Sequence, residues 1–149
     1  MNNPVNLFTG DNMRLNLQRA ERRVLLLLQQ EGPKDAEDIS DELRISLGEV
    51  REAIATLSEA DLVTTPDQTV AELTDFGEKY DLLCDESIDD ELGRLKGCTA
   101  ELLRYIQETE RHPVTLQSLA IHLDRQEYEV SDAADALEDL GYPVKKIIS

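Results

Sequence analysis

The chain matches itself when residue numbers are shifted by 80. Six identical pairs fall in one ungapped window: Pro33/Pro113, Leu43/Leu123, Glu49/Glu129, Val50/Val130, Ala53/Ala133 and Leu57/Leu137. The conservative pairs are Leu26/Ile106, Asp35/Thr115, Ile39/Leu119 and Glu59/Asp139. A repeat at this distance predicts two copies of one supersecondary unit, so a fold assigned to one half constrains the other. The alternative is two unrelated helical hairpins with similar periods.

Three helices are predicted in the first copy. Apolar residues follow helical spacing from Leu17 to Gln30, and Gly32 with Pro33 then ends the run. Asp35 is expected to be the N-cap of a short helix through residue 43. After a brief break, Ser46 and Glu49 form a capping-box pattern that opens a third helix through residue 57. Three helices with a tight turn before the last predict a helix-turn-helix.

A β-hairpin is predicted next, from two β-branched runs at residues 62–65 and 69–73 around Pro66-Asp67-Gln68. Thr74 is expected to cap a helix that contains Phe76, Tyr80, Leu82 and Leu83. Ser87 and Asp90 predict a cap for a linker helix running to Leu95. By the repeat, the three helices recur near 99–110, 115–123 and 127–140. The predicted fold is mainly α with a small β-hairpin wing, a tandem helix-turn-helix. Its parts are an N-terminal arm with little structure (1–16), a first domain (17–84), an acidic linker helix (85–98) and a second, wing-poor domain (99–149).

The charge is strongly acidic and unevenly placed. The chain carries 15 Lys+Arg and 32 Asp+Glu, a formal net charge of −17. Residues 1–30 hold four arginines against two acids, a sum of +2, so the remainder sums to −19. Nucleic-acid binding by bulk charge is excluded. We expect adaptation to very high salt, where a carboxylate-rich surface stays solvated. The competing explanations are an acidic surface for a basic partner and mimicry of DNA.

Several other classes of function are unexpected. The longest aliphatic run, from Val24 to Leu28, has five residues, far fewer than the roughly 20 of a membrane span, so we expect a cytoplasmic protein without membrane contact. Cys84 and Cys98, even with His112 and His122, fit no compact metal-ligand spacing, so no metal and no cofactor is expected. We also predict that the protein is not an enzyme, since no phosphate loop, nucleophile elbow or His-based dyad occurs.

A family resemblance rests on the three helical segments, then Ala60-Asp61-Leu62-Val63, the hairpin, and Leu73-Thr74-Asp75-Phe76-Gly77. Together these residues resemble a winged helix-turn-helix domain of the MarR or PadR kind. The second copy, ending in residues 136–144, resembles the small winged helix of biotin-operon repressors as far as the first strand. There the resemblance ends, because we expect Val144 to Ile148 to form one strand with no returning wing.

The resemblance implies a sequence-specific transcriptional regulator that binds double-stranded DNA, with the third helix in the major groove. On that helix Arg51 is the strong base reader, because arginine binds guanine through two hydrogen bonds. The candidate DNA-binding residues are Ser46, Arg51, Ala55, Thr56 and Gln68 in the first unit and Arg125, Gln126 and Tyr128 in the second. The candidate phosphate contacts are Arg14, Arg19, Arg22 and Arg23; alternatively, these arginines pair with carboxylates of their own chain.

A homodimer is expected through the helix after the wing, as in the family. Tyr80, Leu83, Ile88 and Leu92 are the candidate dimerisation residues, although the same side chains could instead cover the domain's own core. A second hypothesis is a protein-interaction module, since tandem acidic winged helices are also the build of subunits that accompany SMC and kleisin proteins. That hypothesis fits the acidic third helix and the missing wing.

Overall fold

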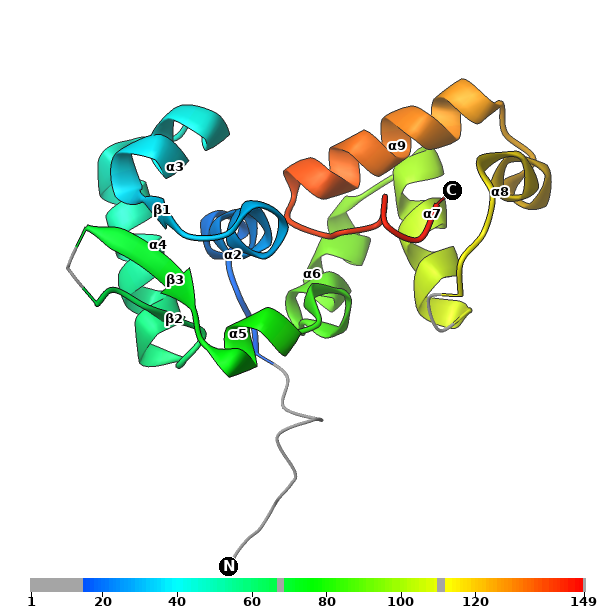
Figure 1. Cartoon of the computed structure of the whole chain (residues 1–149). Coiled ribbons are helices and arrows are strands. Elements are labelled where there is room, and N and C mark those ends of the chain that lie inside the picture. The colour runs from blue at the N-terminus through cyan, green and yellow to red at the C-terminus, as the bar shows by residue number, and fades with distance from the viewer. Residues whose placement is uncertain (1–14, 67–68, 110–111, 149) are drawn as a thin grey trace, which may run out of the picture.

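The computed structural model describes residues 15–66, 69–109 and 112–148, and they form a mainly helical protein with a small three-stranded antiparallel sheet (Figure 1). The first unit contains α2 (Arg19–Glu31), β1 (Lys34–Asp35), α3 (Ala36–Leu43), α4 (Leu47–Glu59), β2 (Val63–Thr64), β3 (Val70–Leu73) and α5 (Asp75–Lys79). A connection with the 3-10 turn η2 (Leu82–Cys84) and α6 (Ser87–Arg94) leads to the second unit. That unit contains α7 (Gly97–Glu108), α8 (Leu116–Leu123) and α9 (Glu127–Asp139).

Side-chain caps set the helix starts in the first unit. The Asp35 carboxylate accepts from the backbone N–H of Asp38 at 2.8 Å, and Ser46 Oγ accepts from that of Glu49 at 3.1 Å. Each bond satisfies a donor that the first helical turn leaves free. Thr74 caps α5 in the same way, accepting from Gly77 at 3.0 Å. The predicted helix-turn-helix elements and the hairpin are therefore confirmed as helices and strands.

The sheet has the order β1-β3-β2, with both pairs antiparallel. Val63 lies opposite Leu73, and Lys34 lies opposite Ala71. The strand β1 was not predicted, because two polar residues carry no alternating pattern and their pairing depends on β3, some 35 residues later. The element order is thus helix, strand, helix, helix, strand, strand.

The repeat holds in the positions of the helices. α8 and α9 begin and end 80 residues after α3 and α4. The turns repeat as well: Arg44 and Asp124 both have φ of 58°, and Asp61 and Gly141 both lie at positive φ. The first helices match differently. The fully buried residues Leu102, Leu103 and Ile106 repeat the spacing of Val24, Leu25 and Leu28, a shift of 78, so the pairing of Leu26 with Ile106 is out of register.

In the second unit, the C-terminal segment pairs at the position where β3 pairs with β1 in the first unit. Where β1 pairs with β3 in the first unit, Val114 forms an isolated parallel bridge with Ile148, and its N–H donates to the carbonyl of Ile147 at 2.9 Å. The expected strand after Val144 is therefore reduced to turns and this single bridge.

The helix α2 lies between the two units (Figure 1). Its residues Val24 to Leu28 are all buried, which one apolar face could not achieve. Two clusters of buried side chains result. One gathers α2, α4 and the sheet, and the other gathers α7, α8, α9 and the residues after α9. The chain thus forms two cores with α2 at their junction.

The region between the units differs from the prediction. The helix capped by Thr74 ends at Lys79, because Tyr80 takes an extended conformation and a 3-10 turn follows. Ser87 is the first residue of α6 and not its cap. The carboxylate of Asp85 instead accepts from the N–H of Ser87 at 3.0 Å. Asp85 and Glu91 are buried, so this acidic segment is partly an interior element.

Candidate nucleic-acid interface

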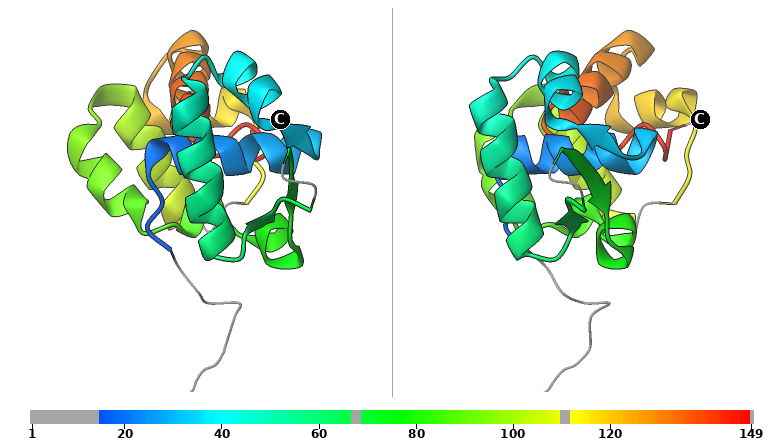
Figure 2. Two further views of the ribbon diagram at one scale, coloured as in Figure 1. Left: turned by 90° about the vertical axis from the view of Figure 1, so that its left-hand side faces the viewer. Right: turned by 60° about the vertical axis from the view of Figure 1, so that its left-hand side comes forward.

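The outer face of α4 is open to solvent. This helix stands on the side of the molecule away from the second unit (Figure 2, left). Val50, Ala53 and Leu57 face the core, whereas the predicted contacts Ser46, Arg51, Ala55 and Thr56 are all exposed. Arg51 makes no hydrogen bond or ion pair with any residue that the structure describes, so its guanidinium is available to a ligand.

A shallow groove lies beside Arg51. It is lined by the start of α3, by α4 and by the ends of the hairpin: Asp35, Ala36, Glu37, Arg51, Ile54, Ala55, Ser58, Thr65 and Thr69. Asp35 and Glu37 make one wall acidic. Glu49, Glu52 and Glu59 are also exposed on α4. Arg51 is therefore the single cation of this face among the described residues, and recognition there depends on short-range contacts rather than on bulk charge.

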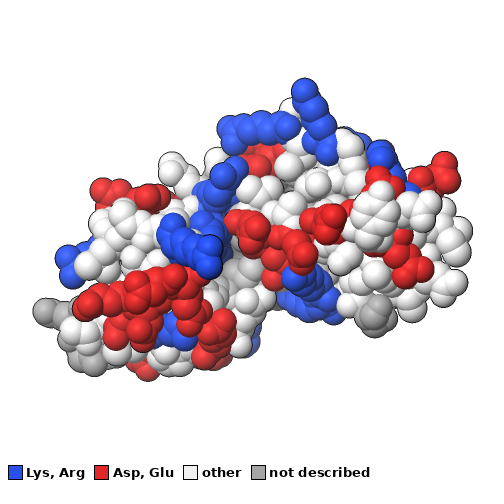
Figure 3. Space-filling view, turned by 90° about the horizontal axis from the view of Figure 1, so that it is seen from above, with Lys and Arg blue, Asp and Glu red and all other residues white. Residues whose placement is uncertain are grey.

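A second, basic groove lies at the junction of the units. Its lining includes Arg19 and Arg23 of α2 and Arg44, which follows α3 and precedes the cap of α4 by two residues. Glu42, Leu43, Asp139 and Leu140 complete it. Arg23 donates to the carbonyl of Leu43 at 2.9 Å, which holds its side chain along the groove. Seen from above, basic side chains gather near the middle of the molecule with acidic ones on both sides (Figure 3).

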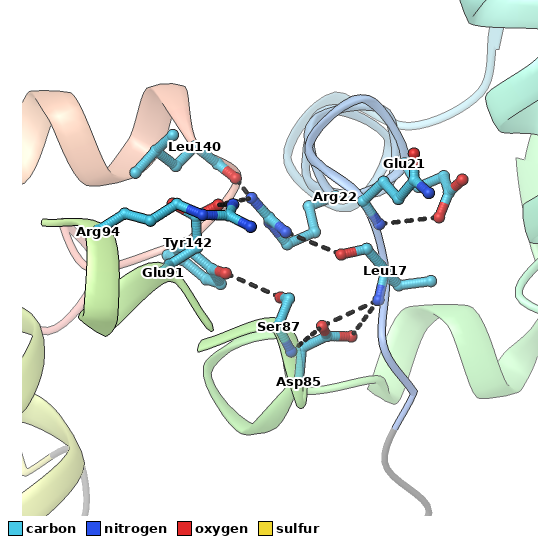
Figure 4. A network of polar contacts seen from close by, with 10 residues as sticks. Leu17, Glu21, Arg22, Asp85, Ser87, Glu91, Arg94, Leu140 and Tyr142 are labelled. Atoms are coloured by element: carbon cyan, nitrogen blue, oxygen red, sulfur yellow. Dashed lines mark hydrogen bonds and ion pairs between the residues drawn. The ribbon is translucent and has the colours of Figure 1, made fainter. Parts of the chain in front are cut away.

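Arg22 is a correction to the predicted phosphate contacts. It is only 2% exposed, and its side chain points into the junction (Figure 4). It donates to the carbonyls of Leu140 and Leu17, each at 2.8 Å, and reaches Glu91 at 3.5 Å. Its guanidinium also lies 4.6 Å from the centre of the Tyr142 ring. This arginine is a structural tie between the units and cannot reach DNA.

The carboxylate of Asp85 forms the other half of this buried network. It accepts from the N–H of Leu17 at 3.0 Å, from the N–H of Ser87 at 3.0 Å and from the hydroxyl of Tyr80 at 2.7 Å. The hydroxyl groups of Ser87 and Tyr142 lie 2.8 Å apart. Burial raises the pKa of Tyr142 above its ordinary value. The network joins Leu17, which precedes the N-cap of α2, to the connection and to the C-terminal segment.

The predicted dimerisation residues are also corrected. Tyr80, Leu83 and Ile88 are buried inside the protomer, and Leu92 packs against the second core. Their apolar surface is used within one chain, as the alternative considered for them required. A homodimer through this seam would need the protomer to open.

Of the DNA contacts predicted in the second unit, Arg125 and Gln126 are engaged by other residues of the same chain. Arg125 bonds both carboxylate oxygens of Glu101, at 2.9 and 3.1 Å, and lies 3.5 Å from Glu129. These hydrogen bonds hold the pKa of Glu101 below its ordinary value. Gln126 caps α9. Tyr128 is exposed.

Two predicted contacts, Arg14 and Gln68, lie outside the described residues.

Within the described ranges, no three His, Cys, Asp or Glu side chains are placed to hold a metal ion. Within the same ranges, no helix has the length and apolar character needed to cross a bilayer. The outward-facing position of Arg51 on α4 was predicted, whereas Arg44 was missed. Its signal was its place in the turn before a capped helix.

Comparison of the chain with protein-family models, with curated proteins and with solved structures found no match.

Proposed function

We propose that this protein is a sequence-specific DNA-binding regulator of transcription and that its first unit is a winged helix-turn-helix. The observation that carries the proposal is the open face of α4, with an unpartnered arginine beside a β-hairpin. The element order and the sheet order β1-β3-β2 support it. The groove beside Arg51 adds support, because it is lined both by α4 and by the ends of the hairpin. The second unit, whose described residues form no β-hairpin, is a reduced copy of the first.

The proposed complex places α4 in the major groove. Residues at the N-terminal end of such a helix reach base edges, and Arg51, on the second turn, is long enough to bind guanine through two hydrogen bonds. Arg44 lies two residues before the N-cap of α4 and shares a groove with Arg19 and Arg23, and these three arginines supply phosphate contacts. Phosphate contacts fix the register of the protein, while Arg51 carries the sequence preference.

The net charge sets the conditions for binding. At about 0.15 M salt the screening length is roughly 8 Å, so a chain with charge −17 is repelled from DNA before short-range contacts form. At molar salt this length falls to about 3 Å, and the repulsion is largely removed. The proposal therefore goes together with adaptation to high salt.

The test is selection of bound duplexes from a random library at several salt concentrations up to about 2 M, followed by fluorescence anisotropy with the selected duplex. Arg51→Ala should weaken specific binding by roughly 10- to 100-fold, since one bidentate base contact is worth about 1–3 kcal/mol. Arg44→Ala should weaken binding to all sequences alike and reduce the salt slope by about 1.

Arg104→Ala is the matched control, because Arg104 is exposed on α7, away from α4. It should bind like the unchanged protein. An unenriched library at every salt concentration contradicts the proposal, as does equal binding by Arg51→Ala and Arg104→Ala.

A further inference from the structure

The helical hairpin formed by α8 and α9 carries the two large apolar side chains that are exposed among the described residues. Ile121 near the end of α8 is 74% exposed, and Tyr128 near the start of α9 is 68% exposed. They flank the turn formed by residues 124–126. Single exposed apolar residues are common, but a pair on one supersecondary element, within eight residues, marks a surface that can bury area against a partner.

The repeat shows that the fold does not require these two residues. Eighty residues earlier, the equivalent positions are Asp41 and Gly48, both exposed in the first unit. The same helices and the same left-handed turn form there without an apolar side chain at either position. Ile121 and Tyr128 therefore add nothing that the hairpin needs for folding, and their exposure calls for another explanation.

The α8–α9 hairpin is also less suited to bind DNA than the equivalent α3–α4 pair of the first unit. The position equivalent to Arg51 is Ser131, and the position equivalent to Ala55 is Asp135, which forms an ion pair with Lys145. The one arginine of the turn, Arg125, is held by two carboxylates. An α9 face without a free cation cannot neutralise phosphates.

A hollow beside Ile121 makes this surface concave. It is lined by Gln117, Ala120, Ile121, Asp124, Arg125, Gln126 and Glu127. The charge around it is negative: Asp124 and Glu127 are exposed, with Asp132 further along α9. A second copy of the same surface would bring like charges together, which disfavours a symmetric contact. A cationic partner gains from the same charges.

We propose that the α8–α9 hairpin docks a basic segment of another protein. An apolar side chain of that segment packs against Ile121 and Tyr128, and flanking lysines or arginines pair with Asp124 and Glu127. The apolar contact supplies the preference for one site, because the molecule is acidic over many other surfaces. The proposal does not depend on DNA binding by the first unit.

The test is a titration of the isotope-labelled full chain, followed by NMR amide shifts, in the lowest salt at which it is folded. The probes are two synthetic 12-residue peptides, one of alternating Lys and Leu and one of alternating Lys and Gln. The Lys-Leu peptide should bind at least 10-fold more tightly than the Lys-Gln peptide. Its shifts should gather on residues 116–132.

The test variant carries Ile121→Asp and Tyr128→Gly, the residues that the first unit has at the equivalent positions. It should bind both peptides with equal affinity. Ile121→Ser is a milder second variant in case the double change unfolds the protein, and it should lose at least 3-fold for the Lys-Leu peptide alone. Arg51→Ala should bind both peptides like the unchanged protein, which separates this proposal from the DNA-binding one.

Three results would overturn the proposal. The first is equal affinity for the two peptides in the unchanged protein. The second is a shift map spread over α3 and its exposed carboxylates as strongly as over the hairpin. The third is no measurable binding of the Lys-Leu peptide at 100-fold molar excess.

Discussion

Replacing Arg22 by methionine tests the junction between the two units. The change removes two hydrogen bonds to main-chain carbonyls, the ion pair with Glu91 and the contact with the Tyr142 ring. Removing one partner of a buried ion pair costs about 3–5 kcal/mol, because the other charge stays buried. Arg94, 3.4 Å from the same Glu91 oxygen, offsets part of this cost. We expect a loss of about 3 kcal/mol.

The assay is urea unfolding followed by circular dichroism, since urea leaves the ionic strength unchanged. A loss of about 3 kcal/mol corresponds to a fall of roughly 6–12 °C in Tm for a chain of this size. Arg19→Met is the matched control on the same helix: Arg19 is exposed, and a surface change of this kind stays within about 0.5 kcal/mol. Arg22→Lys keeps the charge and should lose less than Arg22→Met.

A double-mutant cycle with Glu91→Gln separates the ion pair from the other contacts of Arg22. The two changes should couple by at least about 1 kcal/mol, because the side chains share one buried contact. Equal stability of Arg22→Met and Arg19→Met would refute the placement of Arg22 in the junction. Strict additivity in the cycle would refute the ion pair.

Three further predictions concern the junction and the second unit. Gly141→Ala should destabilise the protein by more than about 2 kcal/mol in urea unfolding, because Gly141 has φ of 94° and an added Cβ would overlap the Cβ of Arg22 on α2. Gly93→Ala, in open space on α6, should be neutral or slightly stabilising. Asp85→Asn should lower the free energy of unfolding by about 1–3 kcal/mol in the same assay, because one of the two carboxylate oxygens that accept three buried hydrogen bonds is replaced by an NH₂ donor. Glu101 has a lowered pKa because Arg125 donates to it, so its stabilisation is present above about pH 4.3 and is lost as pH falls further. Glu101→Gln should accordingly flatten the fall in Tm below that pH.

Each of these has a contradicting result. Gly141→Ala as stable as Gly93→Ala would mean that the tight approach to α2 does not exist. An unchanged Asp85→Asn protein would mean that the carboxylate is not the acceptor described. If Tm falls equally at acid pH in the unchanged protein and in Glu101→Gln, the ion pair of Glu101 with Arg125 does not contribute to the pH dependence of stability.

The helices of both units could be predicted from sequence because their signals are local. Asp35, Ser46 and Thr74 each cap the helix that the pattern assigned to them. At a shift of 80, the second and third helices of the first unit predict the positions of α8 and α9. The same shift does not predict the bounds of α7, because the connection from α7 to α8 is longer than that from α2 to α3.

The junction could not be predicted because its partners are distant in sequence. An arginine on an amphipathic helix is ordinarily solvated, and only contacts with residues 69 and 118 positions away make Arg22 interior. One signal was present: five successive aliphatic residues, Val24 to Leu28, cannot lie on one face of a helix. A helix with such a run is covered on both sides, as α2 is.

Of the candidate site, Arg51 and its exposed neighbours on α4 could be foreseen from the helical period, which separates inward from outward positions. The basic groove could be foreseen only in part. Arg19 and Arg23 were expected to face a phosphate, but their proximity to Arg44 depends on how α2 packs under the end of α3.

Genome-wide immunoprecipitation of the tagged protein from its own cells tests DNA recognition through α4 most directly, because it keeps the native salt. The unchanged protein should give discrete peaks that share a sequence motif at promoters, and Arg51→Ala, expressed at the same level, should lose them. A diffuse profile for the unchanged protein, or the same peaks in both, would contradict the account.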